Sequence, residues 1–301
     1  MRHVAFIAKN RTNPAYEGAL FGARAVAAKH GYEISHSAPH KPDDIEEQGS
    51  LIARAIAERP AAILLIPAHE TKLTGAIRAI NQAGIPLVTL AGEALEGEWV
   101  CHVGADDVRL TCDVALKVLP RLAPGARVAI MDGHPDSITT PKRHRGFLDA
   151  IERFPEARLV ESVTGYYQSA PAREAALGLL ARHPKLDALL AANDLMAMGV
   201  LQALDETGRD LLMVSVNGTP DAVAAIKQER LLASAAFDTL SFGCLGMEAA
   251  ARHLRGEAVP RRIELPTDII DETNWTAWDR PYEARARPDW DSTVRASRPR
   301  S

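Results

Sequence analysis

Short apolar runs alternate with longer amphipathic segments along most of this 301-residue chain, and this alternation constrains the fold more than any other feature. Apolar runs bounded by turn residues are typical of strands covered on both faces, as in a parallel sheet flanked by helices. The pattern predicts strands near residues 3–8, 32–37, 61–66, 86–90, 100–104, 126–131, 158–163, 187–191, 211–216 and 231–236. It predicts helices over residues 14–30, 43–58, 71–83, 106–121, 140–153, 169–183, 194–207, 219–228 and 239–255.

The two halves of the chain repeat one arrangement, which predicts two similar α/β lobes. Residues 58–65 and residues 183–190 each place a proline-containing turn before an apolar strand. In both halves a helix follows, and Gly84 or Gly208 ends it before the next strand. Any two strand–helix–strand units share some of this likeness, so a general resemblance of such units is an alternative explanation. Two lobes with facing strand ends would hold a ligand in the cleft between them.

The overall composition excludes several classes of protein. A chain of 301 residues is long enough for two domains, each with its own core. The formal net charge of −4 shows no basic excess of the kind that nucleic-acid-binding surfaces carry. No apolar run approaches the roughly 20 residues needed to span a bilayer. The first residues lack a basic start and an apolar core, so we expect either a cytoplasmic protein or an exported one numbered without its signal peptide.

The sequence also predicts the state of the three cysteines and of the last residues of the chain. Cys101, Cys112 and Cys244 lie in apolar segments without CxxC spacing, which predicts buried free thiols. From Arg280 onward, Pro, Arg, Ser and Asp dominate the sequence. This composition predicts a solvated tail over residues 281–301 that lies on the surface or is disordered.

Motifs for enzymatic chemistry are missing from the sequence. No GxGxxG segment follows a predicted strand, and no GxxxxGK(S/T) segment occurs, so nucleotide-binding motifs are missing. The sequence also has no GxSxG segment. His69-Glu70 lacks the second histidine of a zinc protease motif, and Pro39 interrupts any helix that would align His36 with His40. No nucleophile, base and orienting group can be assembled from the spacing. We therefore expect no cofactor and no metal site, and an enzyme is the less favoured class.

Polar or aromatic residues directly follow several predicted strands, where open α/β sheets bind small molecules. The residues in these positions are Lys9, Asn193, Asp194, Asn217, Phe237 and Asp238. Amides both donate and accept hydrogen bonds, so they suit a hydroxyl-rich ligand whose buried hydroxyl groups need partners. Alternatively, Asn193 caps the helix at 194–207 and Asn217 forms a turn with Gly218.

The segment Val4–Tyr16, V-A-F-I-A-K-N-R-T-N-P-A-Y, adds further candidates at the end of the first strand. We expect Asn13 to cap the following helix and Pro14 to take its first position. This places Asn13 and Tyr16 near Lys9. Tyr16, together with Tyr167 and Phe237, supplies aromatic rings that can pack on the apolar C–H faces of such a hydroxyl-rich ligand. An ordinary loop with solvated polar residues is the alternative for this segment.

Three segments of the chain resemble the periplasmic sugar-binding proteins of the ribose-binding type. They are the residues 4–16 quoted above, A-A-N-D-L-M-A-M-G at 191–199 and V-S-V-N-G-T-P-D at 214–221, and the likeness extends over about residues 3–272. Members of this family are the soluble receptors of ABC importers, and they share a fold with the effector domains of lac-repressor-type regulators. The resemblance implies two Rossmann-like lobes that close on a sugar through a three-stranded hinge.

The resemblance also implies the lobe boundaries and the binding residues. The three crossovers lie near 103–105, 235–238 and 264–267. The N-terminal lobe comprises residues 1–104 and 238–264, and the C-terminal lobe comprises residues 105–237 and 265–280. The positions that match the family's pocket are Lys9, Asn13, Ala15, Tyr16, Arg143 in the segment K-R-H-R-G-F, Tyr167, Asn193, Asn217, and Phe237 or Asp238.

Departures from the family pattern bear on the ligand. The frequent Asp-Arg pair after the fourth strand is Ala91-Gly92 here, and Asn217 stands where the family usually has Asp. These departures argue against ribose. Lys9 is unusual for the ribose type but similar to a lysine of the autoinducer-2 and rhamnose binders. A site richer in donors favours an acyclic polyol or an oxidised sugar, unless Lys9 pairs with Asp238 or Asp107 and leaves a neutral pocket.

The sequence thus predicts a monomeric, non-enzymatic periplasmic receptor that delivers a monosaccharide or polyol to an ABC permease and does not bind nucleic acid. The alternative is the ligand-sensing effector domain of a lac-repressor-type regulator, which would need a helix-turn-helix before Val4. An α/β enzyme acting on a small polar substrate is a further alternative, and it would need an identifiable base.

Overall fold

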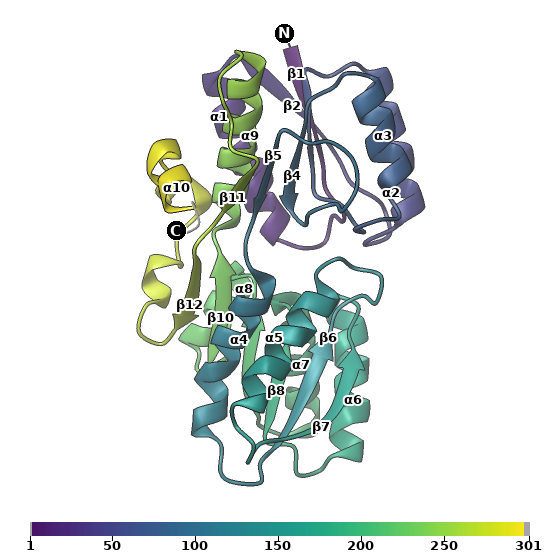
Figure 1. Cartoon of the computed structure of the whole chain (residues 1–301). Helices are drawn as coiled ribbons and strands as arrows, with labels where there is room; N and C mark the ends of the chain where they lie inside the picture. Colours follow the sequence, from purple (N-terminus) through teal and green to yellow (C-terminus); the bar gives the residue numbers. More distant parts are fainter. Residues whose placement is uncertain (1, 298–301) are drawn as a thin grey trace. The chain divides into compact units, whose positions relative to one another are not determined.

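The computed structural model describes residues 2–297, and the chain separates into two compact units (Figure 1). Unit 1 contains Met1–Ala105, Asp238–Pro266 and Pro281–Ser301. Unit 2 contains Asp106–Phe237 and Thr267–Arg280. Each unit is built around its own six-stranded sheet with helices on both faces, so the predicted α/β architecture is confirmed.

The sheet of unit 1 is parallel throughout, in the order β11-β5-β4-β3-β1-β2. Its strands are β1 (Arg2–Ile7), β2 (Tyr32–Ser37), β3 (Ala62–Leu65), β4 (Leu87–Ala91), β5 (Cys101–Gly104) and β11 (Arg262–Glu264). Every residue of β3 and β5 is buried because these strands lie within the sheet and helices cover both faces. The edge strand β2 is more polar and more exposed, as edge strands commonly are.

Two helices pack on each other at each face of this sheet (Figure 1). The helix α1 (Ala15–Lys29) packs closely against α9 (Thr239–Leu254), and α2 (Ile45–Ala57) packs against α3 (Thr74–Gln82). A Cβ atom on Gly243 of α9 would overlap the backbone of α1 at Ala19. Only glycine permits so close an approach of the two helices at this point.

The sheet of unit 2 has the order β12-β10-β9-β8-β6-β7. Its strands are β6 (Arg127–Asp132), β7 (Arg158–Thr164), β8 (Ala188–Ala191), β9 (Leu212–Val216), β10 (Ala233–Phe237) and β12 (Thr267–Asp271). All pairs are parallel except β12, which runs antiparallel to β10 with Ala235 opposite Ile269. The strand β12 therefore adds an antiparallel edge to unit 2.

The helices of unit 2 are grouped in the same way as those of unit 1. One group contains α4 (Asp107–Val118), which continues into a 3-10 turn at Leu119–Arg121, and α5 (Thr140–Glu152). The other contains α6 (Ser169–Arg182), α7 (Asp194–Thr207) and α8 (Pro220–Lys227). These bounds agree with the predicted helices to within a few residues because hydrophobic periodicity and capping are local signals.

The last part of the chain is more structured than the sequence predicts. After a 3-10 turn at Trp275–Ala277 in unit 2, the chain returns to unit 1 and forms a second such turn at Tyr282–Ala284 and the short helix α10 (Trp290–Ala296). The Tyr282 ring stacks on Phe21 of α1 with 6.2 Å between the ring centroids. Residues 281–297 therefore pack on unit 1. Residues 298–301 of the predicted tail lie outside the described residues.

The three cysteines are free and buried, as predicted. Burial raises the pKa of the Cys101 thiol to about 12 and that of Cys244 to about 11, and it also raises the pKa of Cys112. At neutral pH these thiols therefore stay protonated and unreactive. They behave as small apolar core residues.

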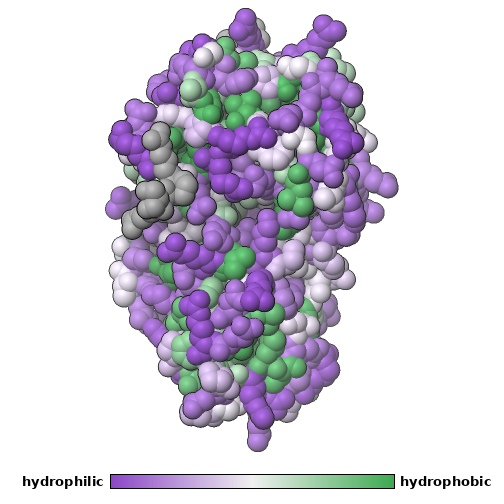
Figure 2. Space-filling view, in the orientation of Figure 1, coloured by the Kyte–Doolittle hydropathy of each residue, from purple (hydrophilic) through white to green (hydrophobic). Residues whose placement is uncertain are grey.

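The described surface is mainly polar. Figure 2 shows a largely hydrophilic face on which hydrophobic residues form small groups among polar ones. The large hydrophobic side chains exposed within residues 2–297 come from separate segments and are Leu95, Leu159, Tyr166 and Leu212. Over the same residues, no helix combines the length and apolar character that crossing a membrane would require.

Candidate functional site

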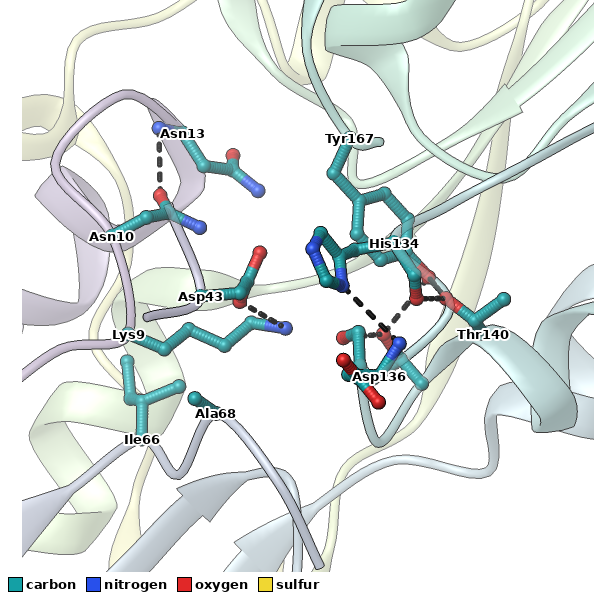
Figure 3. Close-up of polar contacts among 12 residues, drawn as sticks. Lys9, Asn10, Asn13, Asp43, Ile66, Ala68, His134, Asp136, Thr140 and Tyr167 are labelled. Atoms are coloured by element: carbon teal, nitrogen blue, oxygen red, sulfur yellow. Dashed lines mark hydrogen bonds and ion pairs between the residues drawn. The ribbon is translucent and has the colours of Figure 1, made fainter. Parts of the chain in front are cut away.

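In unit 1, the loop after β1 buries a lysine beside an aspartate. Lys9 is only 4% exposed, and its Nζ lies 3.1 Å from Oδ1 of Asp43 (Figure 3). The carbonyl of Lys9 also accepts a hydrogen bond from the backbone N–H of Asp43, at 2.9 Å. Lys9 is therefore paired, as the neutral-pocket alternative requires. The sequence names Asp238 and Asp107 as possible partners, whereas the partner shown here is Asp43, which the β2–α2 loop brings to the end of β1.

Asp43 has two unusual features for a loop aspartate. Its φ of 59° lies in the left-handed region, which residues other than glycine seldom adopt, although Asp tolerates it better than most. Both carboxylate oxygens are buried, and neither accepts a hydrogen bond from the described residues. Sequence reasoning missed this residue. The available signal is the pair Asp43-Asp44, because capping α2 requires only Asp44, whose Oδ1 accepts the N–H of Glu47 at 2.9 Å.

A buried glutamine of α2 holds this loop against the strand ends. The Nε2 group of Gln48 donates to the carbonyls of Ala8 at 3.0 Å and Ile66 at 2.9 Å. Its Oε1 accepts the N–H of Ala68 at 2.9 Å. Gln48 thereby joins the residues that follow β1 and β3 to the first turn of α2, and it fixes the position of the β2–α2 loop.

Asn13 and Tyr16 lie at the start of α1, as predicted. The backbone N–H of Asn13 donates to Oδ1 of Asn10 at 3.1 Å, and its own Oδ1 accepts the N–H of Ala15 at 3.0 Å (Figure 3). Pro14 has helical dihedral angles, φ −57° and ψ −23°, one residue before the helix bound at Ala15, and Asn13 accepts the N–H two residues ahead as a capping side chain does. Tyr16 is half-buried in the first turn. We call Lys9, Asn10, Asn13, Tyr16 and Asp43 the unit 1 set.

The adjacent candidates Phe237 and Asp238 belong to different units. Phe237 ends β10 in unit 2, and Asp238 precedes α9 in unit 1. The Oδ2 atom of Asp238 accepts a hydrogen bond from Ser241 Oγ at 2.6 Å, while its buried Oδ1 has no hydrogen-bond partner among the described residues. Burial raises the pKa of Asp238, and the bond from Ser241 opposes this shift.

In unit 2, a buried arginine on α5 joins several of the predicted residues. The Nε atom of Arg143 donates to Oδ1 of Asp107 at 2.8 Å. Its Nη1 donates to the carbonyl of Ala192 at 2.6 Å and to Oδ1 of Asn217 at 3.2 Å. The side chain is 5% exposed. The guanidinium is therefore held by groups from the start of α4 and from the ends of β8 and β9.

Two aromatic rings complete the surroundings of this arginine. The ring centroids of Tyr167 and Phe237 each lie 5.9 Å from Arg143 Cζ, within the range of cation–π attraction. The Tyr167 hydroxyl is hydrogen-bonded to Thr139 Oγ1 at 2.9 Å and accepts from Thr140 Oγ1 at 3.2 Å (Figure 3). A Cβ on Gly133 would overlap the Tyr167 ring, so the ring position depends on glycine there.

Asn193 caps a helix with its side-chain oxygen, and its side-chain nitrogen makes no hydrogen bond with the described residues. Its Oδ1 accepts the N–H of Met196 at 2.9 Å, so the capping alternative is correct for this atom. Its Nδ2 is buried and has no hydrogen-bond partner within residues 2–297. Asn217 likewise lies in a tight turn, with φ of 127° before Gly218 at 66°. We call Asp107, Arg143, Tyr167, Asn193, Asn217 and Phe237 the unit 2 set.

A fully buried aspartate next to Asn193 supports the unit 2 set. Asp194 Oδ1 accepts hydrogen bonds from Ser215 Oγ at 2.5 Å and Ser234 Oγ at 2.7 Å, and Oδ2 accepts the N–H of Thr219 at 2.7 Å. Burial raises its pKa to about 6, although these hydrogen bonds favour the ionised form. Asp194 links β9, β10 and the start of α8, and it fixes the loops that carry Asn193 and Asn217.

The described residues contain no group of three or more His, Cys, Asp or Glu side chains placed to hold a metal ion. Both sets instead present buried amides, paired cations and aromatic rings. Such groups exchange hydrogen bonds with hydroxyls and carbonyls and pack against C–H faces. This chemistry suits a small, oxygen-rich organic ligand.

Residues 4–258 match the periplasmic binding protein domain, and the chain belongs to that family. The predicted resemblance to the ribose-binding type is confirmed. The ribose import binding protein RbsB of Bacillus subtilis (strain 168) is 28% identical over 257 residues, which cover 85% of this chain and 83% of that protein. The D-allose-binding periplasmic protein of Escherichia coli (strain K12) is 25% identical over 255 residues, with coverages of 81% and 82%. These relatives are solute receptors rather than enzymes.

Solved structures show the same architecture. An ABC transporter solute-binding protein from Mycobacterium smegmatis with bound glycerol matches with a TM-score of 0.85 at 27% identity, over 92% of this chain and 96% of that chain. One from Actinobacillus succinogenes 130z with bound D-allose matches with a TM-score of 0.86 at 21% identity, over 92% and 99%. The second likeness is evidence of the fold alone.

Proposed function

We propose that this protein is the solute-binding receptor of an ABC importer and that its ligand is a monosaccharide or a polyol. The family match over residues 4–258 supports the receptor role. The names of relatives support the ligand class, since they refer to ribose and D-allose, and the similar Mycobacterium smegmatis structure holds glycerol. As in the relatives described as periplasmic, we place the receptor in the periplasm, as a monomer that delivers its ligand to a membrane permease.

The observation that carries this proposal is the convergence of Arg143, Asn193 and Asn217 in unit 2. Arg143 and Asn217 are joined by a hydrogen bond, and Asn193 adds a buried Nδ2 group that needs an acceptor. A ligand hydroxyl supplies both an acceptor for this amide and a donor for a nearby carbonyl oxygen. The Tyr167 and Phe237 rings beside Arg143 would pack against the ligand's C–H groups.

The unit 1 set adds a different kind of group to the proposed site. Lys9 supplies an ammonium donor, Asn13 supplies an amide, and Tyr16 supplies an aromatic ring. Asp238 contributes a buried carboxylate oxygen that accepts no hydrogen bond from the described residues. We propose that Lys9, Asn13, Tyr16 and Asp238 contact a sugar or polyol through these donor, acceptor and aromatic groups.

Thermal unfolding with a panel of ligands tests the ligand class. The panel contains D-ribose, D-allose, D-arabinose and glycerol, followed by calorimetric titration of any compound that raises the melting temperature. A ligand at a thousand times its dissociation constant stabilises the fold by about 4 kcal/mol. In a chain of this size, that corresponds to about 10 °C. If no neutral sugar, polyol or sugar acid in an extended panel shifts the melting temperature, the proposed ligand class is wrong.

A conservative substitution tests whether Arg143 takes part. We expect Arg143→Lys to weaken binding by about 1–3 kcal/mol, because an ammonium cannot reproduce the planar set of donors. Arg145→Lys on the same helix is the matched control, because Arg145 is exposed and pairs with Asp149. Equal affinities for the two variants would remove Arg143 from the site and leave the receptor function in place.

A further inference from the structure

We propose that Asp43 sets the charge class of the ligand: by neutralising Lys9, it makes the receptor select an uncharged polyhydroxylated compound over the corresponding carboxylic acid. This inference rests on the proposed function and makes it more specific. Lys9 alone would favour an acidic ligand, because an uncompensated ammonium in a buried site attracts a carboxylate. The ion pair with Asp43 changes that expectation.

Lys9 in unit 1 and Arg143 in unit 2 are each paired with a buried carboxylate. Lys9 Nζ lies 3.1 Å from Asp43, and the two side chains are 5% and 1% exposed. Arg143 Nε lies 2.8 Å from Asp107, and the two side chains are 6% and 9% exposed. Each pair therefore carries no net charge. A ligand carboxylate would have to give up its hydration without meeting an excess positive charge, which is unfavourable.

The conformation of Asp43 argues that the ion pair does more than support the fold. The neighbouring Asp44 caps α2, and Gln48 anchors the same turn to β1 and β3, so these structural tasks are already performed. Yet Asp43 keeps a left-handed φ of 59° and a buried carboxylate with no hydrogen-bond donor among the described residues. Local strain of this kind is common where a side chain is held for binding.

Asp43 is also the carboxylate of the unit 1 set. The other polar groups of the set are the ammonium of Lys9, the amides of Asn10 and Asn13 and the phenol of Tyr16. A carboxylate can accept several hydrogen bonds from hydroxyl groups. With one oxygen facing Lys9, Asp43 can accept a hydroxyl proton from the ligand on its other oxygen. A ligand carboxylate has no proton to give it at neutral pH.

Three variants at the Lys9–Asp43 pair separate charge from shape. Asp43→Asn removes the negative charge, Lys9→Gln removes the positive charge, and the double variant Lys9→Gln/Asp43→Asn removes both. Glu96→Gln is the matched control, because Glu96 in unit 1 forms an exposed ion pair with Arg78, with side chains 53% and 65% exposed. The probes are matched pairs measured by calorimetric titration: D-ribose with D-ribonate, D-allose with D-allonate, and glycerol with D-glycerate.

We expect the wild type to prefer the neutral member of the pair it binds by at least about tenfold, the ratio that corresponds to about 1.4 kcal/mol. Asp43→Asn should shift this preference toward the acid by a further factor of about 10 or more, because Lys9 is then uncompensated. Lys9→Gln should shift it the opposite way. The double variant, which is neutral like the wild type, should keep the wild-type preference, and Glu96→Gln should change nothing.

The outcomes that overturn the inference differ from those that overturn the proposed function. If the wild type binds an acid as tightly as its neutral partner, or if Asp43→Asn leaves the ratio unchanged, Asp43 does not set the charge class and the receptor function stands. If neither these pairs nor any compound of the extended panel binds, the proposed ligand class fails and the inference fails with it. Should Asp43→Asn not fold, an unchanged ratio in Lys9→Gln overturns the inference equally.

Discussion

Lys9 in unit 1 and Arg143 in unit 2 are both buried cations beside a carboxylate, but their surroundings differ. Arg143 donates to a carboxylate, a backbone carbonyl and a side-chain amide, and two aromatic rings lie beside it. Lys9 meets Asp43, whose backbone is held in a left-handed conformation. A planar guanidinium can satisfy several fixed acceptors at once, whereas an ammonium acts as a compact point charge. The unit 2 set is therefore a fixed framework, and the unit 1 set is where a change of charge can alter selectivity.

The largest expected effect comes from leaving Arg143 without its carboxylate. Asp107→Ala should lower the free energy of unfolding by about 3–5 kcal/mol, because it leaves a buried guanidinium charge uncompensated. Urea unfolding followed by circular dichroism measures this change. Asp205→Ala is the control in the same unit, because Asp205 is 61% exposed and pairs with Arg230. An exposed pair contributes less than about 1 kcal/mol. Equal stabilities of the two variants would show that the Arg143–Asp107 pair is not a framework element.

The pH dependence of stability provides the next test, because Asp194 is a buried carboxylate with hydroxyl and amide donors instead of a cation. Burial raises its pKa from 3.8 to about 6. Between these values the folded protein binds this proton more tightly than the unfolded chain does, so the free energy of unfolding should fall as the pH rises from about 4 to about 6. The contribution is about 2–3 kcal/mol, since one pKa unit corresponds to about 1.4 kcal/mol.

Urea unfolding at several pH values, with wild type and Asp194→Asn compared, isolates this contribution. The difference between the two proteins should change between pH 4 and pH 6 and level off above. Asp271→Asn is a useful control: burial opposes the shift, but hydrogen bonds from Lys117 and Thr273 hold the pKa of Asp271 at about 2. The stabilising contribution of Asp271 should therefore be lost as the pH falls from about 4 toward 2. A constant difference for Asp194→Asn would contradict the assigned titration.

The secondary structure and several candidate site residues could be predicted from the sequence. Strands and helices follow from periodicity and turn residues, which are local, and the ten predicted strands are present. The short strands β11 and β12 add one edge to each sheet and are not among those ten. Arg143, Asn193 and Asn217 could be named because each lies in a recognisable segment. The structure brings Arg143 and Asn217 into direct contact. Whether these residues bind a ligand stays a prediction.

The structural roles of Asp43, Gln48 and Asp194 could not be predicted from the sequence, and the physical reason is the same for all three. Their roles depend on partners that only the sheet register brings near. The parallel pairing of β1 with β2 sets Ile7 opposite Ser37, and the loop that follows β2 then carries Asp43 back to Lys9. Asp194 receives hydrogen bonds from residues on β9 and β10 that lie well beyond it in the chain. Such long-range contacts cannot be inferred from spacing along the sequence.

A smaller effect is expected at the Lys9–Asp43 pair. Lys9→Met should lower the free energy of unfolding by about 2–3 kcal/mol, because it leaves the Asp43 carboxylate buried and unpaired. The double variant Lys9→Met/Asp43→Leu removes both charges and should recover much of this loss. The double-mutant cycle, measured by urea unfolding, gives the coupling energy directly. A coupling energy near zero would mean that the ion pair is not formed in solution, and it would remove the basis for selectivity by charge.

The smallest stability effect, and the sharpest test of the unit 2 set, is expected at Asn193. Its Oδ1 caps α7 and its Nδ2 has no partner within the described residues, so one side chain combines two separable roles. Asn193→Ser keeps an oxygen for the cap and removes the amide nitrogen, so its stability should stay within about 0.5 kcal/mol of wild type. Its affinity for whichever panel ligand binds should fall by about 1–3 kcal/mol, the effect of a lost buried hydrogen bond. Asn193→Ala should show the same loss of affinity together with about 1 kcal/mol of lost stability from the missing cap. If serine instead retains full affinity, Asn193 is a helix cap only, and recognition in unit 2 depends on Arg143, Asn217 and the two aromatic rings.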